Sequence, residues 1–331
     1  MRLHRVTDNP AGPAPKDLPA RSWAGLGGLL LLIHAVLAMA VVLLRLVWPQ
    51  LDLLVSGSTL YSFVIAGLLM QGLLIFLPTL MVILGGRIPT ESLLGGKARA
   101  GSLILALTVG IPAAVVFQGM NNLLIYILVK SGITLPEPAA ANGVSNSEFF
   151  GQPWQIILLI VVVSVILPGL VEELMFRGVI LSAFASTGAG LSAVILQAAA
   201  FAVFHAEPLF LLPPFLAGLM LATIRRNSES LMPAMLAHMS LNLSMLVLAP
   251  LLPQLTVKFL TGSASQANSL LYASLIAACV AAVALVPILV LITHLQSHRP
   301  VDSSRPHFWP ADWKFVLAFV ILIVTMMIEY N

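Results

Sequence analysis

The chain has few charged residues and a single cysteine. Of its 331 residues 9% are charged and 59% are hydrophobic, whereas soluble domains carry about 25% charged residues. A water-soluble core could not bury so much apolar surface, because much of any globule's surface faces water. The lone Cys279 excludes an intramolecular disulfide and a cysteine-based metal cluster. The composition therefore predicts a protein that hides its apolar surface in a lipid bilayer.

The chain also lacks a cluster of basic residues, although its formal net charge is +3. Its lysines and arginines are spread between apolar segments. We therefore interpret them as signals of membrane orientation and not as a surface for nucleic acid. Membrane lipids are the expected surroundings, and no nucleic-acid partner is expected.

Nine apolar segments have, or nearly have, the roughly 20 residues that a helix needs to cross a bilayer. They lie near residues 23–48, 58–85, 101–130, 154–186, 190–206, 209–224, 231–249, 269–294 and 313–330. The first is longer than the core of a signal peptide, so we interpret it as a retained helix. The pattern predicts an all-α, polytopic transmembrane helical bundle of about 8–9 spans around a buried polar cavity.

Four regions follow from these segments. Residues 1–22 are polar and proline-rich, and we expect a disordered cytoplasmic tail. Residues 23–150 would form the N-terminal transmembrane helices and residues 251–331 the C-terminal ones. Residues 151–250 hold the polar side chains described below and would form the catalytic core. No soluble domain and no internal repeat is apparent in the sequence.

The basic residues predict the orientation of the chain. If the N-terminus is cytoplasmic and each segment crosses once, three basic residues flank the outer ends: Arg45, Lys130 and Lys258. The cytoplasmic side then holds Arg2, Arg5, Lys16, Arg21, Arg87, Lys97, Arg99, Arg225, Arg226, Arg299, Arg305 and Lys314. Such an excess is typical of cytoplasmic loops. We expect a multi-pass protein of a plasma or inner membrane.

Glu172, Glu173 and Arg177 lie inside the fourth apolar segment. Charges in a membrane span cost several kcal/mol and usually mark function. Glu173 and Arg177 are four residues apart, so they share a helix face and are expected to form an ion pair. Glu172 is rotated by about 100° from Glu173 and lacks that partner. A carboxylate in a low-dielectric site suits a general base or acid.

Three further polar residues are expected at the depth of Glu172. If the fourth and fifth segments form a hairpin through 188–190, Glu172 and His205 lie about 16 and 15 residues from the turn, or roughly 23 Å. His238 and Asn242 share a helix face in the seventh segment and lie about 18–24 Å into the next antiparallel helix. All four side chains should converge in one buried cavity.

This set of side chains predicts a hydrolase that uses water as its nucleophile. A carboxylate and an imidazole can hold and deprotonate a water molecule, while a second imidazole and a carboxamide can donate hydrogen bonds to an oxyanion. Alternatively, Glu172, His205 and His238 could bind zinc, because two histidines and a glutamate form a known catalytic zinc set. The H-E-x-x-H motif of many zinc proteases is absent, and both chemistries stay open.

In this order, the residues resemble the CAAX prenyl endopeptidase family, also called CPBP or Abi intramembrane proteases. The family's motifs are E-E-x-x-x-R, F-x-x-x-H and H-x-x-x-N. Here they read Glu172–Glu173–Leu–Met–Phe–Arg177, Phe201–Ala–Val–Phe–His205 and His238–Met–Ser–Leu–Asn242. The match spans about residues 155–250, and no motif position departs from the pattern.

The resemblance implies an eight-helix type of α fold around a conical cavity. It implies that Glu172 and His205 activate the water and that His238 and Asn242 form the oxyanion site. Structural or supporting roles would fall to Glu173, Arg177 and Phe201. No cofactor is assigned from the residues alone. Zinc is the open alternative, because members are often described as metalloproteases. Eukaryotic-type members cleave the last three residues from prenylated CAAX proteins, whereas many bacterial members are linked to peptide processing or bacteriocin immunity.

We therefore expect an intramembrane endopeptidase that acts on a membrane-associated protein or peptide, with or without a lipid. A non-catalytic immunity or partner-binding scaffold on the same fold is the main alternative. A transporter that uses Glu172 and the histidines as a proton relay is a weaker one. Transporters often repeat their broken helices in both halves, and the polar groups here are confined to the fourth to seventh segments.

Overall fold

A computed structural model describes residues 20–51, 60–133, 151–187, 190–205, 211–248, 252, 264–294 and 311–329. The tail that the sequence predicts at 1–22 lies outside these residues, except for 20–22, which begin the first helix. The centre of the expected turn at 188–190, residues 188 and 189, also lies outside them.

All nine apolar segments are helical, and the described ranges contain no β-strand. The first three segments give α1 (Ala20–Val47), the run α3–η1–α4 (Leu60–Leu69, Met70–Phe76, Leu77–Gly85), and α6 and α7 (Ala100–Thr108, Gly110–Lys130). The fourth gives α9–η2–α10–η3–α11 (Trp154–Val161, Val162–Ile166, Leu167–Glu173, Leu174–Ile180, Leu181–Ala185). The others give α12 (Gly190–Phe204), α13 (Leu212–Ser228), α14 (Leu231–Leu248), α16 (Ala264–His294) and α17 (Trp313–Glu329). The short α5 (Thr90–Leu94) connects α4 to α6.

Six of these helices are long and apolar enough to cross a membrane. They span Trp23–Val47, Leu60–Gly85, Gly110–Lys130, Trp154–Ala185, Leu231–Leu248 and Ser265–Ile292. The helices α12, α13 and α17 are shorter, with 15, 17 and 17 residues. The predicted class of a polytopic helical membrane protein is therefore confirmed, although fewer helices reach full span length than the eight or nine expected.

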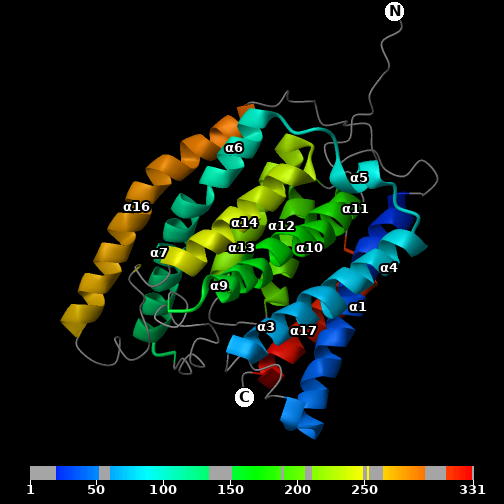
Figure 1. The fold of residues 1–331 in the computed structure, drawn as a ribbon, viewed down its shortest axis with the longest axis horizontal. Helices are drawn as coiled ribbons and strands as arrows, with labels where there is room; N and C mark the ends of the chain where they lie inside the picture. Colours follow the sequence, from blue (N-terminus) through cyan, green and yellow to red (C-terminus); the bar gives the residue numbers. More distant parts are fainter. Residues whose placement is uncertain are drawn as a thin grey trace, which may run out of the picture.

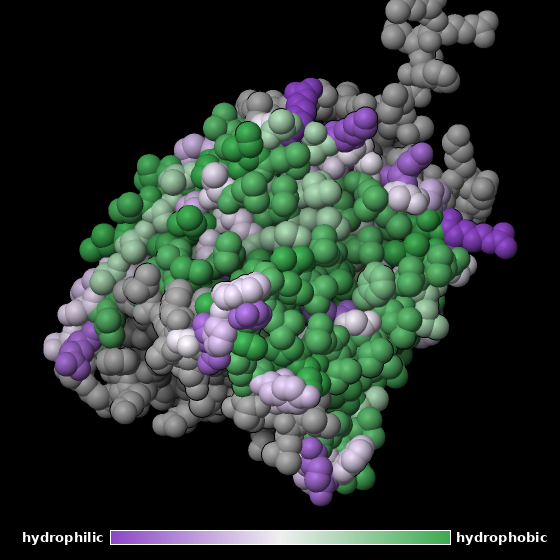
Figure 2. All heavy atoms as spheres, in the orientation of Figure 1, coloured by the Kyte–Doolittle hydropathy of each residue, from purple (hydrophilic) through white to green (hydrophobic). Residues whose placement is uncertain are grey.

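The outer surface of the bundle is largely apolar. Hydrophobic side chains cover most of the face in Figure 2, and hydrophilic ones gather toward its upper and lower edges. On α16, Ile276 and Val283 are 65% and 76% exposed. Contiguous apolar surface of this extent is rare on soluble monomers, and a bilayer would cover it.

The first and last helices run in the same direction. Near their C-terminal ends, Arg45 donates to Glu329 at 2.8 Å. Near their N-terminal ends, Gly28 of α1 lies so close to Asp312 that a Cβ there would be 2.3 Å from the carboxylate. Parallel first and last helices require an odd number of crossings if every segment crosses once. The parallel packing of α1 and α17 is therefore compatible with nine alternating spans.

The helices of the fourth to seventh segments form the centre of the molecule. Figure 1 shows α10 and α12–α14 between two groups, with α6, α7 and α16 on one side and α1, α3, α4 and α17 on the other. One cluster of buried apolar residues connects these groups, including Leu30, Phe176, Phe201, Ala237 and Leu322. The buried polar residues Glu172, Glu173, Arg177 and His238 thus lie among the central helices.

Three π-helical segments, η1, η2 and η3, interrupt the long helices. Such segments are rare and are often found at functional sites. Pro78 and Pro168 each lie two residues beyond η1 and η2. Proline lacks the N–H that would continue the i→i−4 ladder and its ring clashes with the preceding turn, which accounts for the widened turn before each one. The disturbance before Pro168 therefore takes the form of the π-helical segment η2.

Candidate functional site

Glu173 is the fully buried anchor of the polar cluster. Its Oε1 accepts hydrogen bonds from Arg177 Nη1 at 2.6 Å and from His238 Nδ1 at 2.8 Å. The i, i+4 ion pair that helical spacing predicts is therefore present within α10–η3, and the hydrogen bond from His238 joins this pair to α14. Breaking a buried pair leaves an uncompensated charge in an apolar interior. The contact with His238 could not be predicted from spacing, because it joins two helices.

Arg177 is enclosed on every side. Its guanidinium carbon lies 4.4 Å from the centre of the Phe201 ring, and Nη2 donates to the Gly218 carbonyl at 3.4 Å. A guanidinium over an aromatic face gains cation–π attraction, which grows as the charge is desolvated. The neighbourhood of Arg177 thus compensates a charge that lipid could not accommodate.

Glu172 points away from Arg177, as its position on the helix predicts. Its Oε1 accepts a hydrogen bond from Gln71 Nε2 of η1 at 2.8 Å. Its buried Oε2 has no hydrogen-bond partner among the described residues and lies 4.0 Å from His238 Nε2. That distance is too long for a direct hydrogen bond but matches two groups that share a water molecule. Glu172 therefore offers one free oxygen, which faces an imidazole.

The protonation of His238 follows from its partners. A carboxylate accepts hydrogen bonds, so Nδ1 carries the proton that it donates to Glu173. In the neutral ring Nε2 is then a bare acceptor, and it can donate only in the imidazolium form. Two carboxylates, Glu172 and Glu173, lie beside the ring and can compensate that positive charge.

His205 lies at the open side of the cluster. It follows the last residue of α12, its side chain is exposed, and Nδ1 donates to the Phe201 carbonyl at 2.7 Å. Because Nδ1 is the donor, Nε2 of the neutral ring keeps its lone pair. His205 is within electrostatic range of Glu172 and His238. It thus adjoins Glu172 without forming a hydrogen bond to it.

Asn242 lies one turn beyond His238 on α14. Its Nδ2 donates to the carbonyl of Ser164 in η2 at 3.2 Å, and the side chain is half-buried. An amide nitrogen carries two hydrogens, so one N–H remains for another acceptor. The contact fixes Asn242 against the fourth segment on the same side of α14 as His238.

Phe201 holds several of these groups in place. Its ring lies 4.7 Å from the His205 ring and 5.9 Å from the His238 ring, centre to centre, as well as under Arg177. The expected structural role for Phe201 is consistent with these contacts. The structure therefore brings Glu172, Glu173, Arg177 and His238 into direct contact or near it. Around this group it places His205, which donates to the Phe201 carbonyl, and Asn242, which donates to the Ser164 carbonyl.

Sequence reasoning missed Gln71. Its side chain is 7% exposed, whereas its neighbours Leu69, Met70 and Leu73 are 40%, 46% and 54% exposed. The signal was present in the sequence, because Gln71 is the single amide side chain between residues 60 and 85. A polar side chain in an apolar span usually faces the bundle interior.

The described side chains do not form a zinc site. No group of three or more His, Cys, Asp or Glu residues within the described ranges is arranged to hold a metal ion. Zinc ligands lie about 2.0–2.2 Å from the ion. The 4.0 Å between Glu172 Oε2 and His238 Nε2 is wider than neighbouring ligands of one tetrahedral ion require. No step below is therefore derived through a metal.

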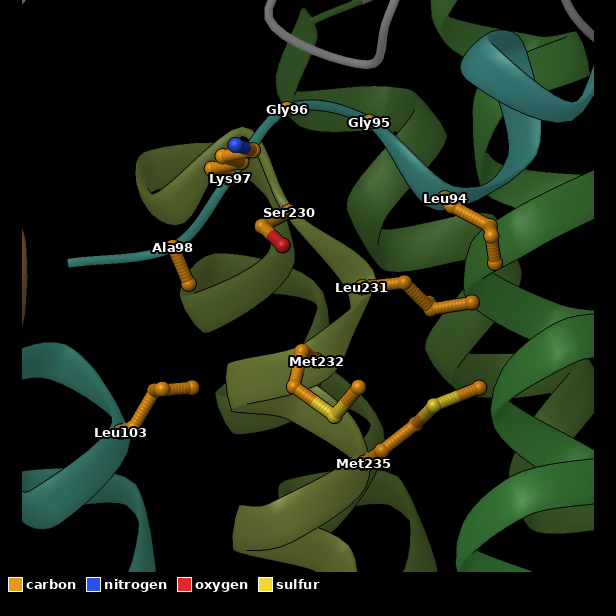
Figure 3. A pocket seen from close by; sticks show the side chains of 10 residues that line it. All are labelled: Leu94, Gly95, Gly96, Lys97, Ala98, Leu103, Ser230, Leu231, Met232 and Met235. Carbon is orange, nitrogen blue, oxygen red and sulfur yellow. The ribbon is translucent and has the colours of Figure 1, made fainter. Parts of the chain in front are cut away.

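Two neighbouring cavities lie at the helices that surround the site, and one of them is lined by Gln71, the donor to Glu172. One, of about 540 Å³, is lined by Gln71 and by apolar side chains that include Leu68, Phe76 and Leu170. The other, of about 480 Å³, lies between residues 94–98 and the start of α14. Leu94 and Met235 line both. In Figure 3, the side chains of Leu94, Leu231 and Met235 extend toward the same side of the second cavity.

Comparison with known proteins gives one match. The family model described as "Type II CAAX prenyl endopeptidase Rce1-like" matches residues 153–244. These residues include all three sequence motifs and the helices that carry the polar cluster. The resemblance that the motifs indicate is therefore confirmed. No curated protein and no solved structure matches the chain.

Proposed function

We propose, from the membership of residues 153–244 in the type II CAAX prenyl endopeptidase family, that the protein is an active intramembrane endopeptidase. It hydrolyses a peptide bond of a membrane-associated protein or peptide, with lipid-modified substrates included. The observation that carries the proposal is the buried, unpartnered Oε2 of Glu172, which lies 4.0 Å from an imidazole nitrogen of His238.

Glu172 is the proposed base. A water held at its Oε2 transfers a proton to the carboxylate as its oxygen bonds to the carbonyl carbon of the substrate. The π electrons of that carbonyl move to its oxygen. The proton then passes to the amide nitrogen, and the carbon–nitrogen bond breaks. Nε2 of His205 is the second acceptor for the water, because Nδ1 already donates to Phe201. A positioned base contributes about 10²–10⁴-fold.

His238 and Asn242 are the proposed donors to the oxyanion. As an imidazolium, His238 presents an N–H at Nε2, and Asn242 presents its remaining amide N–H. Donors that are fixed before the reaction stabilise the developing charge without reorganisation. The bond from His238 to Glu173 and the bond from Asn242 to Ser164 supply this fixation. Glu173 and Arg177 then act through His238 and do not touch the substrate.

Zinc remains the alternative to a metal-free reaction. Glu172, His205 and His238 are the residues that would hold it. When bound, zinc would polarise the carbonyl and acidify the attacking water. We expect metal-stripped protein to keep its activity, because the described side chains form no three-ligand set. The measurement is peptide cleavage after exhaustive chelation, with zinc added back. Lost activity that zinc restores would establish the metal enzyme.

The decisive experiment compares wild type with Glu172→Gln. Glutamine keeps the size of the side chain and an oxygen that can accept from Gln71, but it removes the base. Purified proteins are incubated with prenylated CAAX peptides and a library of membrane peptides, and the products are read by mass spectrometry. We expect cleavage by wild type and a loss of about 10²–10⁴-fold in the variant. Glu91→Gln, an exposed position on α5, is the matched control.

Full activity of the Glu172→Gln variant would show that Glu172 is not the base of the reaction. No cleavage by well-folded wild type would instead favour a non-catalytic immunity or partner-binding scaffold. One observation favours that second function, because the exposed His205 makes no hydrogen bond with Glu172. Both functions use the same buried cluster, so this experiment separates them.

We also propose that the protein lies in the plasma or inner membrane with its N-terminus in the cytoplasm, surrounded by lipid. The bias of basic residues supports this orientation. The parallel directions of α1 and α17, joined by Arg45 and Glu329, support an odd number of crossings. Cysteine labelling from either side of the membrane, at single positions in residues 95–98 and 131–133, would test it.

A further inference from the structure

Gln71 is the side chain through which the second apolar segment reaches the candidate base. It lies on η1, next to exposed apolar residues, and turns inward, so that the residue is only 7% exposed. Its Nε2 lies 2.8 Å from Glu172 Oε1. Among the described residues it is the one hydrogen-bond donor to Glu172, so it controls how that carboxylate is held.

The chemistry of the pair fixes the orientation of the amide. An ionised carboxylate only accepts hydrogen bonds, so the amide nitrogen, and not the oxygen, must face Glu172. The terminal torsion of a glutamate has broad, roughly two-fold wells. Without a donor on one oxygen, the carboxylate of Glu172 could turn about this torsion. The donor from Gln71 occupies Oε1 and leaves Oε2 as the oxygen that faces His238 at 4.0 Å.

Burial alone does not distinguish Gln71. Gln197 on α12 is fully buried too, and both of its side-chain polar atoms are without partners among the described residues. Polar side chains between membrane helices often serve only as interhelical contacts. Gln71 differs because its one hydrogen bond goes to the carboxylate that carries the proposed reaction. Gln197 is therefore the matched control for a buried glutamine that lacks this contact.

We propose that Gln71 is a positioning residue for the peptidase reaction, and the inference rests on the proposed function of Glu172. By donating to one carboxylate oxygen, Gln71 fixes the orientation of the group, so that the other oxygen faces His238 and takes the proton from water. Gln71 also lines the apolar cavity of about 540 Å³, whereas Glu172 does not. Methionine at 71 would keep this lining, because it is straight and of similar length. Because Gln71→Met removes only the hydrogen-bond donor, the substitution should slow the chemical step and leave substrate binding unchanged.

The experiment measures kcat and KM for Gln71→Met, Gln71→Asn and Gln197→Met with the peptide that wild type cleaves. Gln71→Asn keeps an amide but is one methylene too short to reach Glu172, so it separates the lost bond from lost polarity. It also carries the test if Gln71→Met fails to fold. A hydrogen bond to a charged group corresponds to roughly a 10- to 100-fold effect. We expect kcat to fall by this factor in both variants at position 71, with KM within about twofold. Gln197→Met should leave both constants unchanged.

A spectroscopic measurement tests the inference without any activity. The infrared difference between wild type and Glu172→Gln isolates the carboxylate bands of Glu172. Unequal hydrogen bonding of the two oxygens sets the separation of these bands. We expect that separation to change in both Gln71 variants and to stay unchanged in Gln197→Met.

The outcomes distinguish this inference from the proposed function. If wild type is inactive but the bands shift, the peptidase assignment fails and the positioning of Glu172 by Gln71 stands. If wild type is active while both the bands and kcat are unchanged in folded Gln71 variants, the positioning role is wrong. A rise in KM at unchanged kcat would also overturn it, because Gln71 would then serve only as cavity lining.

Discussion

Two ion pairs with similar geometry occupy opposite environments in this molecule. In the centre, Arg177 and Glu173 approach to 2.6 Å with both side chains fully buried. At the ends of α1 and α17, Arg45 and Glu329 approach to 2.8 Å with side chains 33% and 30% exposed. The distances alone would suggest equal importance. Burial makes the difference, because a desolvated charge that loses its partner has no water to replace it.

The two regions of the bundle are held together by different kinds of contact. The centre combines charges, an aromatic ring and histidines that contact one another across the fourth-segment helix, α12 and α14. The periphery relies on apolar contacts and on small residues such as Gly28, where α1 meets α17. Lipid is as apolar as a leucine side chain, so peripheral contacts gain little from burial and depend on close packing. Mutations of the same chemical type should therefore have unequal effects in the two regions.

The largest stability difference is expected between Arg177→Ala and Arg45→Ala. The first leaves Glu173 buried beside His238 alone and should cost about 3–5 kcal/mol. The second removes a partly solvated pair and should cost about 0–1 kcal/mol. Thermal unfolding in detergent, followed by the fraction of monodisperse protein, measures both. Equal losses in the two variants would contradict the view that burial decides the importance of the pair.

Truncation of an isoleucine to alanine is expected to give an intermediate difference in stability between the centre and the periphery. Ile180 of η3 is fully buried, and Ile276 of α16 is 65% exposed. Ile180→Ala should leave a cavity in the apolar core and cost about 2–5 kcal/mol. Ile276→Ala exchanges one lipid contact for another and should stay within about 0.5 kcal/mol. The same unfolding assay applies, and a large loss for Ile276→Ala would indicate that α16 packs against a partner there.

Replacement of a glycine by alanine is expected to give the smallest difference in stability between a closely packed and an open position. A Cβ on Gly218 of α13 would lie 2.8 Å from the Ala198 backbone, whereas nothing lies within 4 Å of one on Gly85. Gly218→Ala should therefore cost about 1–3 kcal/mol through overpacking, and Gly85→Ala should be neutral or slightly stabilising. Gly218 also carries the carbonyl that accepts from Arg177. If Gly218→Ala kept wild-type stability, α12 and α13 could move apart without destabilising the protein.

The class of fold and part of the site could be predicted from the sequence. Nine apolar segments gave nine helical regions, because a bilayer requires every backbone polar group to be satisfied within a helix. The Glu173–Arg177 pair followed from spacing on one helix. The same reasoning correctly left Glu172 without a partner on its own helix. It could not identify Gln71, since sequence spacing carries no information about which face of a distant helix meets Glu172.

The two histidines show most clearly what could not be predicted from the sequence. Depth arguments placed His205 and His238 near Glu172. In the structure His238 Nε2 lies 4.0 Å from Glu172 Oε2, and His205 is within electrostatic range of Glu172. Depth fixes only the level of a residue along a helix and not the direction of its side chain. His238 turns its Nδ1 to Glu173, and His205 turns its Nδ1 back to its own helix. The roles of the two rings depend on these rotations, which arise from how the helices pack.

The sequence by itself determined that this protein is a helical membrane protein with a few charged side chains in its fourth segment, because apolar length and charge placement are local properties. It also determined the motif pattern that identifies residues 153–244 with a protease family. Only the tertiary structure decided which oxygen of Glu172 is free, which nitrogen of His238 carries a proton, and where the π-helical segments η1, η2 and η3 widen the helices. Those features depend on contacts between helices that are far apart in the chain, and such contacts form only when the bundle packs.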